Sequence, residues 1–132
     1  MTSDAATFGE AGTAKYVNLT TYRKDGTPVA TPVWAVLEGA RLLVWTETEA
    51  WKVKRIRRNP KVLVQATDAR GKKVTGEPVA GTAVVLDAEG TAHVRKKLIE
   101  KYGLLARVLI FASKVRRGES GTIGIAITAG DQ

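Results

Sequence analysis

The segment 46–58 brings together the groups needed to bind a phosphorylated ligand. Five of the eight residues from Trp51 to Arg58 are basic. On a predicted helix, Lys52 and Arg55 are three residues apart and would share a face. The first backbone N–H groups of a helix are unpaired and lie at the positive end of its dipole. A helix start with two adjacent cations is therefore a candidate phosphate site.

Aromatic and hydroxyl side chains flank these cations. Trp45 and Trp51 would place aromatic faces beside them. Thr46 and Thr48 would place hydroxyls where a strand meets the helix, and Thr48 is predicted to cap the helix. A planar heterocycle with a phosphate tail needs an aromatic wall, hydrogen-bonding partners and a cationic cradle. The spacing alone is equally compatible with a solvated basic helix, and the segment matches no glycine-rich phosphate-loop motif.

Composition limits the classes of protein and of chemistry. The chain has 132 residues, a net charge of +8 and no cysteine. We therefore expect one domain over 1–132, an anionic partner, and neither thiolate catalysis nor a cysteine zinc site. No apolar run reaches membrane-spanning length and no secretory signal is visible, so a cytoplasmic protein is expected. The carboxylates form no recognisable catalytic pair, and we predict no catalytic or metal-binding side chain.

Hydrophobic patterning predicts a small barrel decorated by helices, a mainly β fold of the α+β class. A short opening helix is expected over 4–14. Strands are expected at 16–22, 27–37, 41–46, 61–67, 74–87 and 121–128, and helices at 49–58, 91–102 and 104–115. The helix over 49–58 should end at Asn59 because Pro60 cannot continue it. Pro28 and Pro32 cannot donate to a ladder, which places their strand at an edge, and Gly76 and Gly81 indicate bulges or corners.

Two features outside this segment allow more than one interpretation. An apolar stripe at helical spacing begins at Leu104 and is flanked by Arg107, Lys114 and Arg116. Packing in the core or in a dimer is its first interpretation, and a helix on a membrane surface is the alternative. His93 is the only histidine and is expected to be a solvated surface residue.

Several blocks of sequence resemble a known family. The blocks 27–34, 42–46 and 51–62 are similar in type and order to those of the pyridoxamine-phosphate-oxidase-like group. The similarity is greatest to its branch of flavin- and deazaflavin-dependent oxidoreductases. It extends to the 101–105 junction and the final strand at 124–127.

The resemblance implies a fold, a cofactor and an activity. The fold would be a six-stranded split β-barrel (the FMN-binding split barrel), homodimeric, with the cofactor at the dimer interface. The activity would be hydride transfer from reduced coenzyme F-420 to a small organic acceptor. FMN is the alternative cofactor, and a non-catalytic cofactor carrier is the alternative role. Hydride transfer needs few protein groups, because the ring supplies the chemistry. A nucleic-acid-binding module is the more distant alternative, and no nucleic-acid motif supports it.

The resemblance also assigns roles to residues. Lys52 would hold the cofactor phosphate with help from Arg55, while Lys54, Arg57 and Arg58 would meet the polyglutamate tail of F-420. Ala50 stands where some relatives have a second phosphate-binding arginine. The complete set of implied cofactor-binding residues is Thr31, Pro32, Val33, Trp34, Val44, Trp45, Thr46, Thr48, Trp51, Lys52, Arg55 and Arg58.

Overall fold

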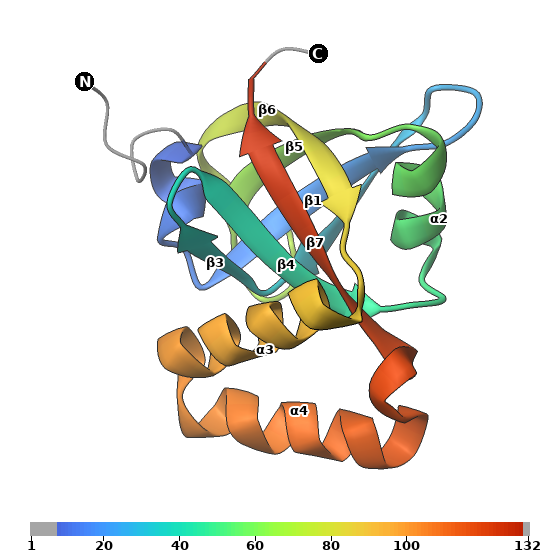
Figure 1. Cartoon of the computed structure of the whole chain (residues 1–132). Coiled ribbons are helices and arrows are strands. Elements are labelled where there is room, and N and C mark those ends of the chain that lie inside the picture. The colour runs from blue at the N-terminus through green and yellow to red at the C-terminus, as the bar shows by residue number, and fades with distance from the viewer. Residues whose placement is uncertain (1–7, 131–132) are drawn as a thin grey trace.

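In a computed structural model that describes residues 8–130, one antiparallel sheet curls into an open barrel (Figure 1). Its strands are β1 (Tyr16–Tyr22), β2 (Pro28–Val33), β3 (Ala35–Glu38), β4 (Arg41–Glu47), β5 (Lys61–Thr67), β6 (Thr75–Val85) and β7 (Thr122–Ala129). Their spatial order is β2-β1-β5-β6-β7-β4-β3. Consecutive strands β2 and β3 thus lie at opposite edges of the sheet. The short connection between them therefore spans the opening between the two edges. This is the predicted split barrel.

The predicted strand over 27–37 is wrong in one respect, because it divides into two strands at Trp34. Val33 is paired with Val17 of β1, whereas Ala35 is paired with Val44 of β4. Each half therefore has a different neighbour, and the described residues form seven strands where six were expected. The edge position predicted from Pro28 and Pro32 is confirmed, since both lie in β2.

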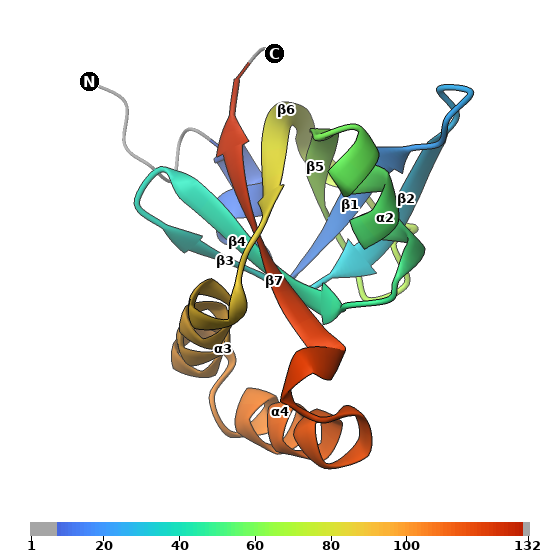
Figure 2. The ribbon, with the colours of Figure 1, turned by 45° about the vertical axis from the view of Figure 1, so that its right-hand side comes forward.

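Three α-helices and two short 3-10 helices complete the described part of the chain (Figure 2). They are α2 (Trp51–Arg58), α3 (Ala88–Tyr102), α4 (Leu104–Arg117), η1 (Gly9–Gly12) and η2 (Glu119–Gly121). Helix α2 lies against the side of the barrel, while α3 and α4 lie together at one end. Of the predicted opening helix over 4–14, the structure describes Phe8 as helical and Gly9–Gly12 as η1, and residues 4–7 are outside the described range.

Helix α2 begins later than predicted. Its N-cap is Ala50, which makes no side-chain cap. Thr48 is therefore not the cap, and its Oγ1 instead donates to the Ser120 carbonyl oxygen at 2.7 Å. The predicted end at Asn59 is confirmed.

Two apolar clusters lie on opposite faces of the sheet. Leu42 and Val44 of β4 point into the barrel, where Val53 and Ile56 of α2 join them. Leu43, between the two β4 residues, packs on the other face against α3 and α4. The alternation follows from the two-residue period of a strand. The packing therefore fixes α2 to the barrel and α3 to the sheet.

Strand β6 is irregular where glycine was predicted to mark a bulge. Its register with β5 shifts between Val64 and Ala66. Gly76, in the shifted segment, has a φ of +69°, a conformation that side chains other than glycine rarely adopt. Gly81 lies close to β7, because a Cβ there would be 2.7 Å from the Thr128 carbonyl oxygen. The backbone conformation at Gly76 and the close approach of β7 at Gly81 therefore explain why glycine stands at these two positions.

Gly124 of β7 lets α3 approach the sheet. A Cβ at Gly124 would lie 2.7 Å from Cγ2 of Val94, and the Gly124 N–H donates to Thr91 Oγ1 at 2.9 Å. We predict that Gly124→Val lowers the free energy of unfolding by about 1–3 kcal/mol, because the α3 contact is overpacked. Urea denaturation measures this, with Thr128→Val, at an exposed position of the same strand, as the control. Equal midpoints for the two variants would show that α3 does not pack as described.

Candidate cofactor site

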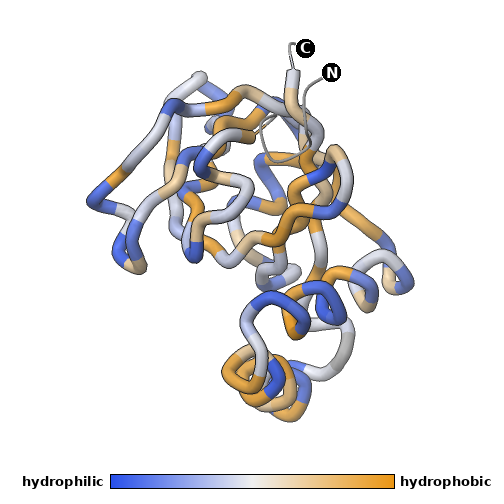
Figure 3. The backbone as a smooth tube through the Cα atoms, turned by 90° about the vertical axis from the view of Figure 1, so that its left-hand side faces the viewer, coloured by the Kyte–Doolittle hydropathy of each residue, from blue (hydrophilic) through white to orange (hydrophobic). Residues whose placement is uncertain are grey.

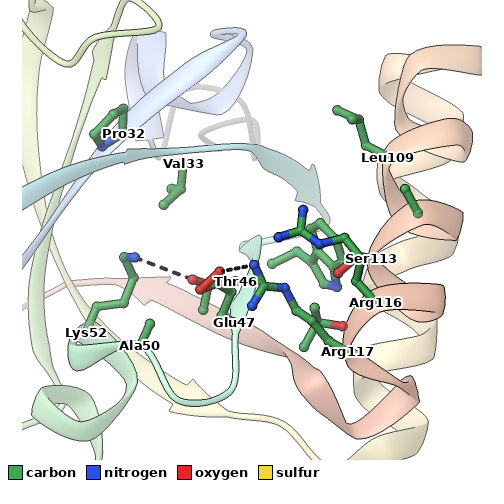
Figure 4. A pocket seen from close by; sticks show the side chains of 13 residues that line it. Pro32, Val33, Thr46, Glu47, Ala50, Lys52, Leu109, Ser113, Arg116 and Arg117 are labelled. Atoms are coloured by element: carbon green, nitrogen blue, oxygen red, sulfur yellow. Dashed lines mark hydrogen bonds and ion pairs between the residues drawn. The ribbon is translucent and has the colours of Figure 1, made fainter.

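A cleft of about 440 Å³ opens where β4 ends and α2 begins (Figure 4). Pro32 and Val33 of β2 border one side, and Trp45 and Thr46 of β4 lie opposite. Helix α4 forms a further wall. Its volume is in the range of small-molecule and cofactor sites. We call it the cleft.

Lys52 is the cation at the α2 side of the cleft. Its side chain is half-buried, and Nζ donates to Thr46 Oγ1 at 3.4 Å. Burial is the main cause that lowers the pKa of Lys52; Glu47 opposes this effect and Arg55 adds to it. A partly desolvated ammonium group has lost water without gaining a full counter-charge in its place. An anion in the cleft would supply that charge.

Helix α4 contributes cations on the opposite wall. Arg117 Nη2 lies 2.9 Å from Glu47 Oε2, so the carboxylate of the cleft is already in an ion pair. Arg116 also lines the cleft, and Ser113 adds a hydroxyl one turn earlier. The lining residues within the described part of the chain thus include three cations and one carboxylate, which favours an anionic ligand.

Trp45 supplies the aromatic wall. Its Nε1 is buried and has no hydrogen-bond partner among the described residues. An unsatisfied buried donor is costly, by about 1–3 kcal/mol. An acceptor that reached this N–H would relieve this cost. The aromatic wall, the hydroxyls of Thr46 and Thr122, and the cations therefore fit a flat ring with an anionic tail.

The structure brings together some of the predicted site residues. Pro32, Val33, Trp45, Thr46 and Lys52 all line the cleft. The remaining ones lie elsewhere.

Four predicted residues belong to other surroundings. Trp34 stacks on Tyr102 with ring centroids 4.5 Å apart, because it lies at the crossing between β2 and β3. Val44 is fully buried in the barrel, since its strand position points inward. Thr31 is paired with Leu19 in the β1–β2 ladder and does not line the cleft. Thr48 is turned toward Ser120, as described above.

Arg55 does not line the cleft with Lys52, although the two were expected to form one cradle. Arg55 lines a second depression of about 500 Å³ on the outside of α2, here called the outer groove. Trp51 and Arg58 line it too, because spacings of four and seven residues place them on one stripe of the helix. Lys52 follows Trp51 directly and therefore lies a little more than a quarter turn from Trp51 around the helix. The other residues of the groove are Arg23, Lys24 and Lys54.

Helix α4 was not predicted to contribute to the site. Its apolar spacing indicated packing, and its C-terminal arginines read as flanking charges. The available signal was the pair Arg116 and Arg117, which lies shortly before the final strand. That strand, β7, is paired with β4. Only the strand order, which the sequence does not show, turns these residues into a wall of the cleft.

The His93 side chain is 42% exposed, as expected of a surface residue, and it also has a partner. Its Nε2 lies 2.5 Å from Glu38 Oε2. This contact is the main cause that lowers the pKa of Glu38, with Arg41 second. His93 lines neither the cleft nor the outer groove.

The sequence profile described as pyridoxamine 5'-phosphate oxidase matches residues 6–131. The chain belongs to this family. Across the described residues, no helix of this pyridoxamine 5'-phosphate oxidase family member is both long and apolar enough to cross a bilayer. No curated protein sequence shows detectable similarity to it.

Solved structures share the fold of this family member. A protein from Listeria innocua assigned as a pyridoxamine 5'-phosphate oxidase is 20% identical, with a TM-score of 0.61 over 97% of this chain and 94% of the other. An F-420 reductase is 18% identical, with a TM-score of 0.60 over 94% of each chain. A heme storage protein from Vibrio cholerae is 14% identical, with a TM-score of 0.64 over 100% of this chain and 93% of the other. At these identities the likeness shows the fold and not the ligand.

Proposed function

We propose that the protein is an oxidoreductase that transfers a hydride from reduced coenzyme F-420 to a small organic acceptor. The cofactor would bind in the cleft. The observation that supports this best is the half-buried Lys52 amine, which faces Thr46 and lies in a cleft that also contains Trp45. The likeness to an F-420 reductase agrees with the proposal.

Five residues of the cleft have a physical task in this proposal. Lys52 and the Thr46 hydroxyl would hold the cofactor phosphate through charge-assisted hydrogen bonds. Pro32, Val33 and Trp45 would form the wall against the ring and exclude water from it. When bound, the deazaflavin ring supplies the hydride, so the protein needs to orient and shield it.

The outer groove favours F-420 over FMN. It has five cations around Trp51, which is 70% exposed, and no carboxylate among those of its lining residues that the structure describes. Lys52 and Arg55 are close enough to affect each other electrostatically, so the groove lies near the cleft. The polyglutamate tail of F-420 would lie along Arg55 and Arg58. Arg57 would not take part, since it lines a different cavity.

We further propose a homodimer in which α4 meets a second copy. Leu104, Val108, Phe111 and Val115 are between 55% and 75% exposed. By helical spacing they form one stripe on the side of α4 opposite its buried residues, Ala106 and Ile110. Figure 3 shows that much of α4 is coloured as hydrophobic. An exposed apolar patch of this kind marks an interaction surface. Because another side of α4 lines the cleft, burial of the stripe would also fix the cleft wall.

The alternatives are FMN as the cofactor and a carrier role without turnover. Heme is considered because a heme storage protein shares the fold. The cleft contains no histidine among its described lining residues, and His93 is paired with Glu38. We therefore favour a flavin-like ring.

A titration followed by a turnover assay tests the proposed function. Calorimetry with F-420 and with FMN should show sub-millimolar binding of F-420 and weaker binding of FMN. Reduced F-420 should then be oxidised, seen by its absorbance, when acceptors of several chemical classes are added with the protein. Binding without oxidation by any acceptor would indicate a carrier. Binding of heme with a Soret band, and not of F-420, would contradict the proposal.

A further inference from the structure

The chain crosses from one edge of the sheet to the other at Trp34, which belongs to neither ladder. Val33 before it is paired with Val17 of β1, and Ala35 after it is paired with Val44 of β4. Strands β2 and β3 are the edges of the described sheet, so each has a strand partner on one side only. Because Val33 lines the cleft, contacts that hold this crossing also bear on the position of a cleft wall.

Lys101 and Tyr102, the last two residues of α3, supply such contacts, and we call them the clasp. Lys101 Nζ donates to the Ala35 carbonyl oxygen at 2.6 Å. The Tyr102 hydroxyl lies 3.0 Å from the same oxygen and accepts the Ala35 N–H at 3.3 Å. The Tyr102 ring is stacked on Trp34, with 10° between the ring planes. The clasp therefore holds both the backbone and the aromatic side chain of the crossing.

The clasp also holds the segment that leads into β1. Lys101 Nζ donates to the Ala14 carbonyl oxygen at 2.7 Å, and the Tyr102 hydroxyl lies 2.7 Å from the Lys15 carbonyl oxygen. Strand β1 begins at the next residue and is the ladder partner of β2. The crossing is thus tied to the start of the strand with which β2 pairs.

The clasp is carried by a helix that is fixed to the sheet. Val94 and Leu98 of α3 are fully buried against it. Both clasp side chains are half-buried, and burial lowers the pKa of Lys101 and raises the pKa of Tyr102. A buried amine is costly unless it is hydrogen-bonded, so the carbonyl contacts hold Lys101 in place. Neither clasp residue lines the cleft or the outer groove.

We propose that Lys101 and Tyr102 are positioning residues, which hold the crossing between β2 and β3 and thereby keep Val33 on the wall of the cleft. They act through the backbone of the crossing and not by touching a ligand. Without the clasp, β2 keeps its ladder with β1, but the crossing opens locally. The effect on cofactor affinity rests on the proposed function, whereas the effect on the crossing does not.

Amide hydrogen exchange of the unliganded full chain, followed by NMR, tests the effect on the crossing. Tyr102→Phe keeps the stacked ring and removes the hydroxyl, while Lys101→Met keeps the apolar stem and removes the amine. We expect each variant to speed exchange at Val33, Trp34 and Val36 several-fold, and the double variant about tenfold or more. Exchange in β5, which the clasp does not contact, should stay as in the wild type.

Two control variants separate positioning from charge and from overall stability. Lys96→Met removes an exposed lysine of the same helix and should leave exchange at the crossing unchanged. Val64→Ala, in the barrel core on β5, should lower overall stability and speed exchange across the sheet without favouring the crossing.

Calorimetry with F-420, at a temperature where all variants are folded, tests the effect on the cleft. We expect the double variant of the clasp to bind F-420 about tenfold more weakly than the wild type. Lys96→Met and Val64→Ala should bind it as the wild type does, because both leave the crossing in place.

Exchange at the crossing that is unchanged in the double variant, or that rises only as much as across the sheet, would overturn the proposal. Faster exchange at the crossing with undiminished F-420 affinity would also overturn it, because the crossing would then not set the cleft wall. If the double variant does not fold, Tyr102→Phe alone decides by the same criteria. A wild-type protein that does not bind F-420 would contradict the proposed function, and the exchange result would then decide the role of the clasp.

Discussion

Replacing Lys52 by methionine is expected to weaken binding of coenzyme F-420 by about 1.5–3 kcal/mol, or roughly 10- to 150-fold. Methionine keeps the length and apolar stem of the side chain but removes the charge that would meet the phosphate. The amine is half-buried and donates to Thr46 Oγ1, so its loss removes a positioned charge and not a mobile one. Titration calorimetry measures the change.

Lys61→Met is the matched control for this experiment. Lys61 is exposed on β5 and outside the cleft and the outer groove, and its replacement removes the same formal charge. Equal losses in the two variants would mean that only net charge attracts the cofactor. An unchanged affinity in Lys52→Met would place the phosphate elsewhere.

The same lysine gives the binding a pH dependence. Burial lowers the pKa of Lys52 below its ordinary value of 10.5. A bound phosphate favours the protonated amine, so affinity should be full below the pKa of the unliganded protein and fall as pH rises through it. The fall should therefore begin at lower pH than for an exposed lysine, and Lys52→Met should remove it.

Introducing Val108→Glu and Phe111→Glu together is expected to convert the proposed homodimer into monomers. Both side chains lie on the exposed stripe of α4, at 55% and 68% exposure. Each dimer would then bury four uncompensated carboxylates, at several kcal/mol apiece, so the dissociation constant should rise about 100-fold or more. Analytical ultracentrifugation over a range of concentrations measures this.

Val84→Glu is the control for the α4 variant. Val84 is 58% exposed on β6 and lies outside α4. A dimer that survives changes in α4 but not at Val84 would use a different surface from the one proposed. A wild-type protein that is monomeric yet binds F-420 tightly would contradict a cofactor site completed by the second copy.

Local signals in the sequence were sufficient to predict most elements. The end of α2 at Asn59 followed from Pro60, and the edge strand followed from Pro28 and Pro32, since proline acts through its own missing N–H. The split at Trp34 was not predictable in this way. It depends on which strand pairs with each half of 27–37, and that is a property of the whole sheet.

The candidate site was predicted only in part for a similar reason. Lys52 and Thr46 are six residues apart at one strand–helix junction, so the contact between their side chains could be predicted from the local sequence. Arg116 and Arg117 reach the cleft through the pairing of β7 with β4, which joins distant parts of the chain. Arg55 was expected beside Lys52 from their three-residue spacing, but it lines the outer groove, where its four-residue spacing from Trp51 places it.

We propose that the cleft, and not another surface, binds the ring of the cofactor. The most direct test is an NMR titration with F-420 that follows the three tryptophan indole N–H signals. We expect the largest shift for Trp45, whose buried Nε1 has no hydrogen-bond partner among the residues described, and a small one for Trp34, which is stacked on Tyr102. A large shift at Trp51 with Trp45 unchanged would contradict it, because the ring would then lie in the outer groove.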